Sequence, residues 1–119
     1  MTDTGHMLSL SQSQTEQLAH ACAAYRSYAW QMLAPTPERN QTMRVAQAMQ
    51  GRLAEMRALG AEQCVLCISG EERQALRTVV STLIQIYGGE PPTPERIQLL
   101  GALAALRALL ERSRQTQAF

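Results

Sequence analysis

Apolar residues recur at helical spacing in four stretches of the chain, near 12 to 34, 37 to 59, 70 to 87 and 94 to 113. In each stretch they follow one another by three or four positions, so they fall on one stripe of a helix. The four stripes are Leu18, Cys22, Tyr25, Ala29 and Met32; Ala46, Met49, Leu53 and Met56, widened by Leu59; Leu76, Val79, Leu83 and Ile86; and Leu99, Leu103, Leu106 and Leu110. The pattern predicts four amphipathic helices that share one core.

Helix boundaries are marked by capping and breaking residues. Ser11 with Gln14, and Ser69 with Glu72, have the spacing of a capping box, in which each partner satisfies a free backbone N–H of the other. A proline or glycine interrupts the chain after each of the first three stretches, which predicts helix ends at Pro35, Gly60 and Gly88.

The second half of the chain repeats the first. Thr-Pro-Glu-Arg, a typical helix start with proline at the first helical position, occurs at 36–39 and 57 positions later at 93–96. Leu-Ser-Leu-Ser at 8–11 resembles Leu-Cys-Ile-Ser at 66–69, which lies 58 positions on. The expected fold class is therefore all-α, a four-helix bundle built from two sequence-similar antiparallel helical hairpins.

One domain over 1–119 accommodates this fold, since a chain of that length can bury a sizeable core without disulfides. We expect hairpins at 11–60 and 69–113. The remaining segments have no helical caps and are expected to be a flexible N-terminus at 1–10, an extended linker across the bundle end at 61–68, and a frayed tail at 114–119.

Composition and charge exclude several classes of protein. With 45% hydrophobic and 18% charged residues, the chain is neither disordered nor a membrane span. The net charge is +1, and Arg alternates with Glu along the expected helices, so no nucleic-acid surface is predicted. All eleven basic residues are Arg, which excludes a Schiff-base or phosphate-loop lysine. The Arg, Ala and Leu bias suggests a GC-rich bacterial genome.

The sequence contains few of the residues and motifs that enzymes use for catalysis. There are two His, the only Asp is Asp3 near the terminus, and no phosphate-binding loop or nucleophile elbow occurs. We therefore expect no enzyme and no cofactor. Three cysteines, an odd number without a signal peptide, indicate free thiols and a cytoplasmic location.

Cys64 and Cys67 form the one pair with metal-ligand or redox spacing. Only His20 or Cys22 could complete a metal site, and the two point in very different directions on a helix. Cys67 also aligns with Ser9 in the repeat, which suggests a position that only has to be small. We expect no metal, with Cys64 and Cys67 as weak candidates, and interpret them first as structural thiols.

Glu16 and His20 are four residues apart and could be read as an acid/base or metal pair. A di-iron bundle site needs Glu and His three apart on two helices, with further glutamates, and neither condition is met. A surface pair on one helix is the favoured interpretation.

Two surplus apolar faces suggest an interface. Trp30, the only tryptophan, lies off the core stripe beside Ala19, Ala23 and Arg26, which is the composition of an interface centre. Alternatively, Trp30 only covers the hairpin end near Pro35. The last helix has a second face of mostly small residues, formed by Ile97, Gly101, Ala104, Ala105 and Ala108, which predicts close packing inside the bundle or against another subunit.

The function expected from these observations is a protein-interaction or oligomerisation module, a homodimer that binds neither nucleic acid nor membrane. The runner-up is a thiol-based metal or redox sensor using Cys64 and Cys67. A third hypothesis places a small ligand between the helices, against Tyr25, Tyr28, Met49 and Met56, although these residues also make an ordinary core.

Overall fold

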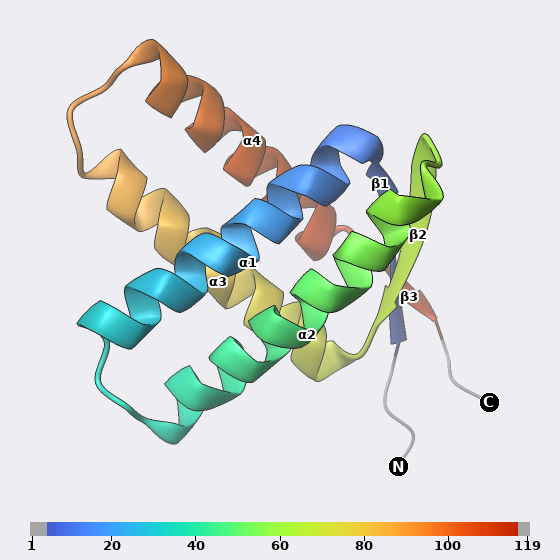
Figure 1. The fold of residues 1–119 in the computed structure, drawn as a ribbon, viewed down its shortest axis with the longest axis horizontal. Coiled ribbons are helices and arrows are strands. Elements are labelled where there is room, and N and C mark those ends of the chain that lie inside the picture. The colour runs from blue at the N-terminus through green and yellow to red at the C-terminus, as the bar shows by residue number, and fades with distance from the viewer. Residues whose placement is uncertain (1–4, 117–119) are drawn as a thin grey trace.

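The computed structural model describes residues 5–116, which form two successive β-α-α units and a short final strand (Figure 1). The first unit contains β1 (Gly5–Ser11), α1 (Gln12–Met32) and α2 (Pro37–Leu59). The second contains β2 (Gln63–Ile68), α3 (Gly70–Gly88) and α4 (Pro94–Glu111), and β3 (Arg114–Thr116) follows. The predicted helical character is confirmed in its coarse form, because four helices make up most of the chain; the sheet was not predicted.

Three predicted irregular segments contain the strands. The expectation of a flexible terminus at 1–10 is wrong from Gly5 onwards, where β1 begins. The segment 61–68 is extended as predicted, but from Gln63 it is the paired strand β2. The expected frayed tail contains β3 up to Thr116. Residues 1–4 and 117–119 lie outside the described part of the chain.

The three strands form an antiparallel sheet in the order β2-β1-β3. Leu8 lies opposite Leu66, and these are the two residues that the sequence repeat aligns with each other. Each unit therefore contributes the equivalent strand to the central pair, and an approximate twofold axis passes between the two leucines. β3 pairs with the start of β1, with Gly5 opposite Thr116.

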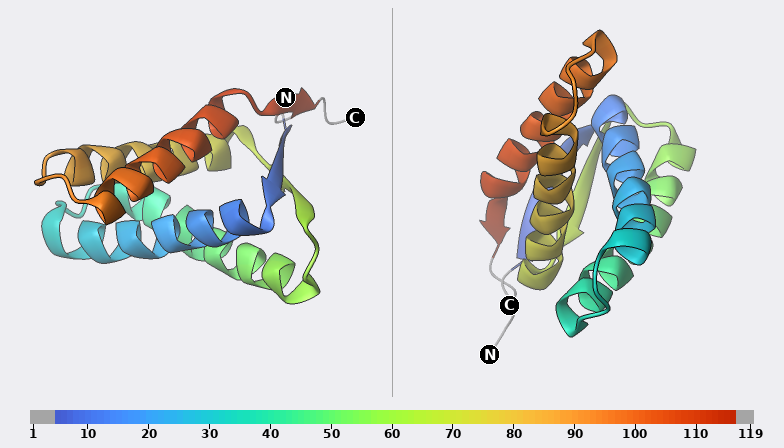
Figure 2. Two further views of the ribbon diagram at one scale, coloured as in Figure 1. Left: turned by 90° about the horizontal axis from the view of Figure 1, so that it is seen from above. Right: turned by 90° about the vertical axis from the view of Figure 1, so that its left-hand side faces the viewer.

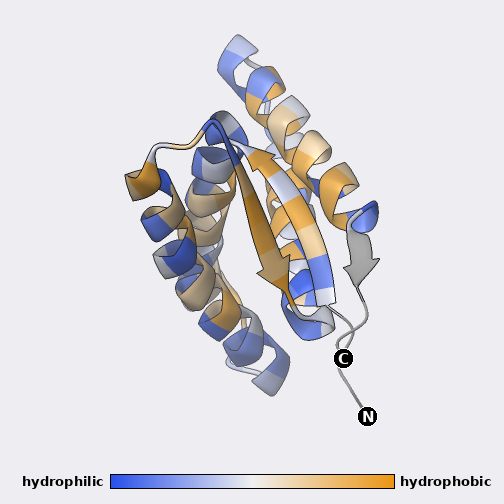
Figure 3. Cartoon of the chain, turned by 90° about the vertical axis from the view of Figure 1, so that its right-hand side faces the viewer, coloured by the Kyte–Doolittle hydropathy of each residue, from blue (hydrophilic) through white to orange (hydrophobic). Residues whose placement is uncertain are grey.

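One face of this sheet lies on the helices and the other faces outwards (Figures 2 and 3). Because strand side chains alternate between faces, Leu8 and Leu10 point inwards with Leu66 and Ile68, and all four are buried. Val65, which precedes Leu66 in β2 and points to the other face, is 60% exposed. Burial of these two apolar pairs gives the physical reason why segments without helical caps become strands.

α1 runs antiparallel to α2, and α3 antiparallel to α4 (Figure 1). The predicted stripes form a single core with the inward side of the sheet, and Leu76, Leu83, Leu103 and Leu106 are all buried. Three predicted core residues are instead exposed: Met32, Leu59 and Leu99. Met32 and Leu59 are the last residues of α1 and α2, whereas Leu99 lines an open cavity between α1, α3 and α4.

Both predicted capping boxes are present. The Gln14 backbone N–H donates to Ser11 Oγ at 3.1 Å, and the Ser11 N–H donates to Gln14 Oε1 at 2.9 Å. Ser69 and Glu72 make the equivalent pair of bonds at the start of α3. Ser11 is also the last residue of β1, so the strand leads directly into the cap of its helix.

Two arginines connect α2 and α4, the second helices of the two units, to neighbouring elements. Arg52 of α2 donates to the Cys67 carbonyl of β2 and pairs with Glu72 at 3.4 Å. Arg73 of α3 donates to the Leu110 carbonyl at 2.7 Å and thereby satisfies a free acceptor at the end of α4.

No helix among residues 5–116 is long and apolar enough to span a membrane.

Replacing Leu66 by alanine should lower the free energy of unfolding by about 2 to 5 kcal/mol, because it leaves a cavity where the two units meet. Val65→Ala, the neighbouring change on the exposed face, should cost less than about 1 kcal/mol. Urea unfolding followed by circular dichroism measures both. Equal losses would contradict the assignment of inward and outward faces to β2.

Candidate functional site

The small-residue face of α4 lies on the outside of the protein. Ile97 is 61% exposed, and Gly101, Ala104 and Ala105 are also exposed, while Ala108 is half-buried. The opposite side of the helix is buried in the core. This face therefore does not pack inside the protein, so that predicted possibility is wrong. The other possibility, contact with another subunit, stays a prediction.

Gly101 has no packing role within the protomer. A Cβ atom added at this position would meet nothing within 4 Å, and the backbone there is ordinary helix. Glycine in a helix interior costs up to about 1 kcal/mol relative to alanine. Gly51 in α2 is equally open and exposed, which makes it a matched reference for changes at Gly101.

Trp30 lies at the end of the first helix pair and is 70% exposed. The Arg39 guanidinium sits over its ring, 5.6 Å from the ring centre, and donates to the Leu33 carbonyl at 3.2 Å. This arrangement matches the alternative in which Trp30 covers the hairpin end, because its ring is held by the same arginine that caps α1.

The residues expected to accompany Trp30 lie along the groove between α1 and α2. Arg26 donates to Gln50 Oε1 at 2.6 Å and is thus engaged within the protomer. Ala19 is half-buried and Ala23 is exposed. The four predicted residues do lie on one side of α1, but two of them are already bound to α2 residues, so the outer face of α4 is the freer surface.

Cys64 and Cys67 lie on a strand, which separates their side chains. Residues three apart on a strand point to opposite faces of the sheet, and Cys64 is half-buried whereas Cys67 is exposed. The two thiols therefore cannot bind one metal ion together while β2 is intact. Within residues 5–116 no group of three or more metal-binding side chains comes together.

Cys22 is fully buried in α1. Burial raises the pKa of this thiol to about 12, and nearby Arg26 lowers the pKa only in part. A thiolate at this position is thus disfavoured at neutral pH, and the side chain acts as a small core residue.

Glu16 and His20 do not form the predicted surface pair. Glu16 pairs with Arg57 of α2 at 3.8 Å, an exposed ion pair. His20 is exposed and lies at the edge of a cavity between α1, α3 and α4, and it also borders the groove between α1 and α2.

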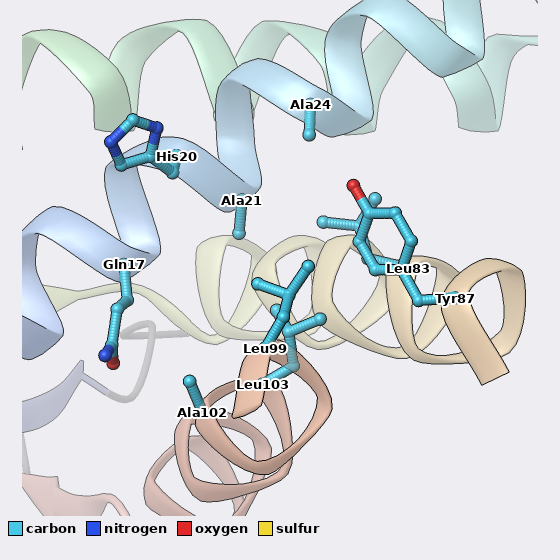
Figure 4. Close-up of a pocket in the computed structure, with 9 residues that line it drawn as sticks. All are labelled: Gln17, His20, Ala21, Ala24, Leu83, Tyr87, Leu99, Ala102 and Leu103. Carbon is cyan, nitrogen blue, oxygen red and sulfur yellow. The ribbon is translucent and has the colours of Figure 1, made fainter. Parts of the chain in front are cut away.

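This cavity, called here the α1/α4 cavity, has a volume of about 330 Å³ (Figure 4). It is formed by side chains from all three helices: Gln17, His20, Ala21 and Ala24 of α1, Leu83 and Tyr87 of α3, and Leu99, Ala102 and Leu103 of α4. The predicted ligand site differs from it, since Tyr25 and Met49 are buried in the core. No periodic signal reveals the cavity in the sequence, because it depends on the spacing between α1 and α4.

The fold is thus a duplicated β-α-α unit whose two equivalent strands pair with each other, with an apolar outer face on α4 and an apolar cavity between α1, α3 and α4. Comparison with known proteins gives no match: no family model, no curated protein and no solved structure is similar to the chain.

Thiol titration tests the burial of the cysteines. In the native protein at pH 8, Cys64 and Cys67 should react with a disulfide reagent, and Cys22 should react only after denaturation, because its thiolate is suppressed by burial. A Cys22→Ala variant should lose only the reaction that follows denaturation. Rapid native reaction of Cys22 would contradict the closed core around α1.

Proposed function

We propose that the protein is a self-associating interaction module, and that two copies pair through the outer faces of their α4 helices. The observation that carries this proposal is a difference between the two units. At positions equivalent to Ile97, Gly101 and Ala104, 57 positions earlier, α2 carries Asn40, Arg44 and Gln47. The other two positions of this face, Ala105 and Ala108, correspond to Ala48 and Gly51. The outward face therefore carries three polar residues in one unit and only apolar or small residues in the other.

The fold itself does not require apolar residues at all five positions, because α2 has polar residues at three of the equivalent positions. Small side chains let two helix backbones approach closely, and Ile97 supplies a larger apolar contact at the edge. A pair of antiparallel α4 helices satisfies twofold symmetry, in which the same patch is used on both subunits. An 18-residue helix is about 27 Å long, which is enough for a continuous contact.

Three unpaired thiols suit the reducing cytoplasm in which we place the protein. The proposal assigns no catalytic residue and no cofactor. The thiol sensor is the weaker alternative, because strand geometry separates the two cysteines on which it depends.

Introducing the α2 residue into α4 tests the proposal. Gly101→Arg should shift the protein from dimer to monomer in sedimentation equilibrium, raising the dimer dissociation constant at least about 100-fold, because a buried unpaired charge would face its own copy. The helix should tolerate the change, since a side chain at this position meets nothing within 4 Å in the protomer.

Gly51→Arg is the matched control, because it makes the same change at an equally open helix position. This variant should remain a dimer in sedimentation equilibrium. Trp30→Ala should also remain a dimer. A wild-type protein that stays monomeric over a wide concentration range would disprove self-association, and loss of the dimer in the Trp30 variant alone would move the interface to α1.

A further inference from the structure

We propose that the α1/α4 cavity binds a neutral, mostly apolar small molecule with a hydrogen-bonding group at one end. Its volume of about 330 Å³ lies within the range of ligand pockets and equals that of about ten water molecules. This site is separate from the outer face of α4, which lies on the other side of the same helix.

The shape and polarity of the cavity define the ligand. Leu99 and Leu103 lie in the middle of the cavity, with His20 and Gln17 at one end and the Tyr87 hydroxyl at the other (Figure 4). Leu99 is 42% exposed, and a bound apolar group would remove part of this apolar surface from water. The polar ends provide donors and acceptors for a hydroxyl or amide.

Charge selects against ionic ligands. The nine lining residues include no carboxylate and no guanidinium. Apart from His20, which can carry a positive charge, no lining residue would compensate a charged ligand for the hydration that it loses in this mostly apolar site, which is unfavourable. A neutral ligand avoids this loss of charge hydration when it enters the cavity.

The other unit shows that this chemistry is not imposed by the fold. The equivalent groove, between α2 and α3, is bordered by the carboxylates of Glu38 and Glu71 and by polar residues. This groove therefore has charged groups at its border, although most of its lining surface is apolar, whereas the lining of the α1/α4 cavity contains no carboxylate and no guanidinium.

Alanines widen the cavity at three positions where the other unit has β-branched residues. Ala21 and Ala24 correspond to Val79 and Thr82, 58 positions later, and Ala102 corresponds to Val45, 57 positions earlier. Restoring the larger side chains should fill the space with residues that the fold already accommodates at equivalent places.

The test uses the full chain and 2-naphthol, a neutral bicyclic probe with one hydroxyl, with calorimetry as the measurement. Wild-type protein should bind 2-naphthol with a Kd near or below about 0.1 mM, as expected for a ligand of this size. The anion 2-naphthoate should bind at least about 10-fold more weakly. The double variant Ala24→Thr/Ala102→Val should weaken 2-naphthol binding at least about 10-fold.

Ala23→Thr is the matched control, because it makes the same change one residue away on the exposed side of α1 and should not alter binding. Circular dichroism checks that each variant is folded. Chemical-shift changes in the wild type, which do not depend on any variant, should centre on Ala24, Leu99 and Ala102. Absence of 2-naphthol binding, equal binding of 2-naphthoate, unchanged binding by a folded double variant, or shifts centred elsewhere would each overturn the proposal.

Discussion

The pairing of β1 with β2 is the constraint on which the rest of the structure depends. Leu8 and Leu66 face each other across the approximate twofold axis, and their inward side chains join the helices of both units in one core. A slip of one residue would turn these leucines, with Leu10 and Ile68, to the outer face. Because Ser11 and Ser69 follow directly as helix caps, the register of the strands also fixes where α1 and α3 begin.

Helix positions could be predicted from the sequence because local signals determine them. The expected start at 37 and end at 59 are those of α2, where a capping threonine, a proline and a left-handed glycine act within a few residues. The strands were missed although their signal was visible. Leu8-Ser9-Leu10 and Leu66-Cys67-Ile68 alternate apolar residues with a small serine or cysteine, as strands do. Each segment buries too little apolar surface to be stable alone, and the strand that it pairs with lies 58 positions away in the sequence.

The candidate sites were also predictable to different extents, depending on whether local helix signals or long-range packing determine them. The second face of α4 follows from helical spacing alone, but the sequence left open whether it packs inside the bundle or against another subunit, and the structure shows that it is exposed. The separation of Cys64 from Cys67 required knowing that they lie on a strand. The α1/α4 cavity depends on how far two helices stand apart, which is a property of the assembled core and not of any one segment.

A fold made of two equivalent units distinguishes residues that the fold requires from residues that it only permits. The paired leucines, the capping boxes and the threonine caps occur in both units and are explained by the architecture. Gly101 and Arg44 occupy equivalent positions with opposite chemistry, so architecture explains neither. β1 of the first unit pairs with β2 of the second within one chain. A single β-α-α unit would need a second copy of itself to pair its strand in this way. For this reason we place the proposed contact between two copies on a surface where the units differ, the outer face of α4, whose residues Ile97, Gly101 and Ala104 replace Asn40, Arg44 and Gln47 of α2.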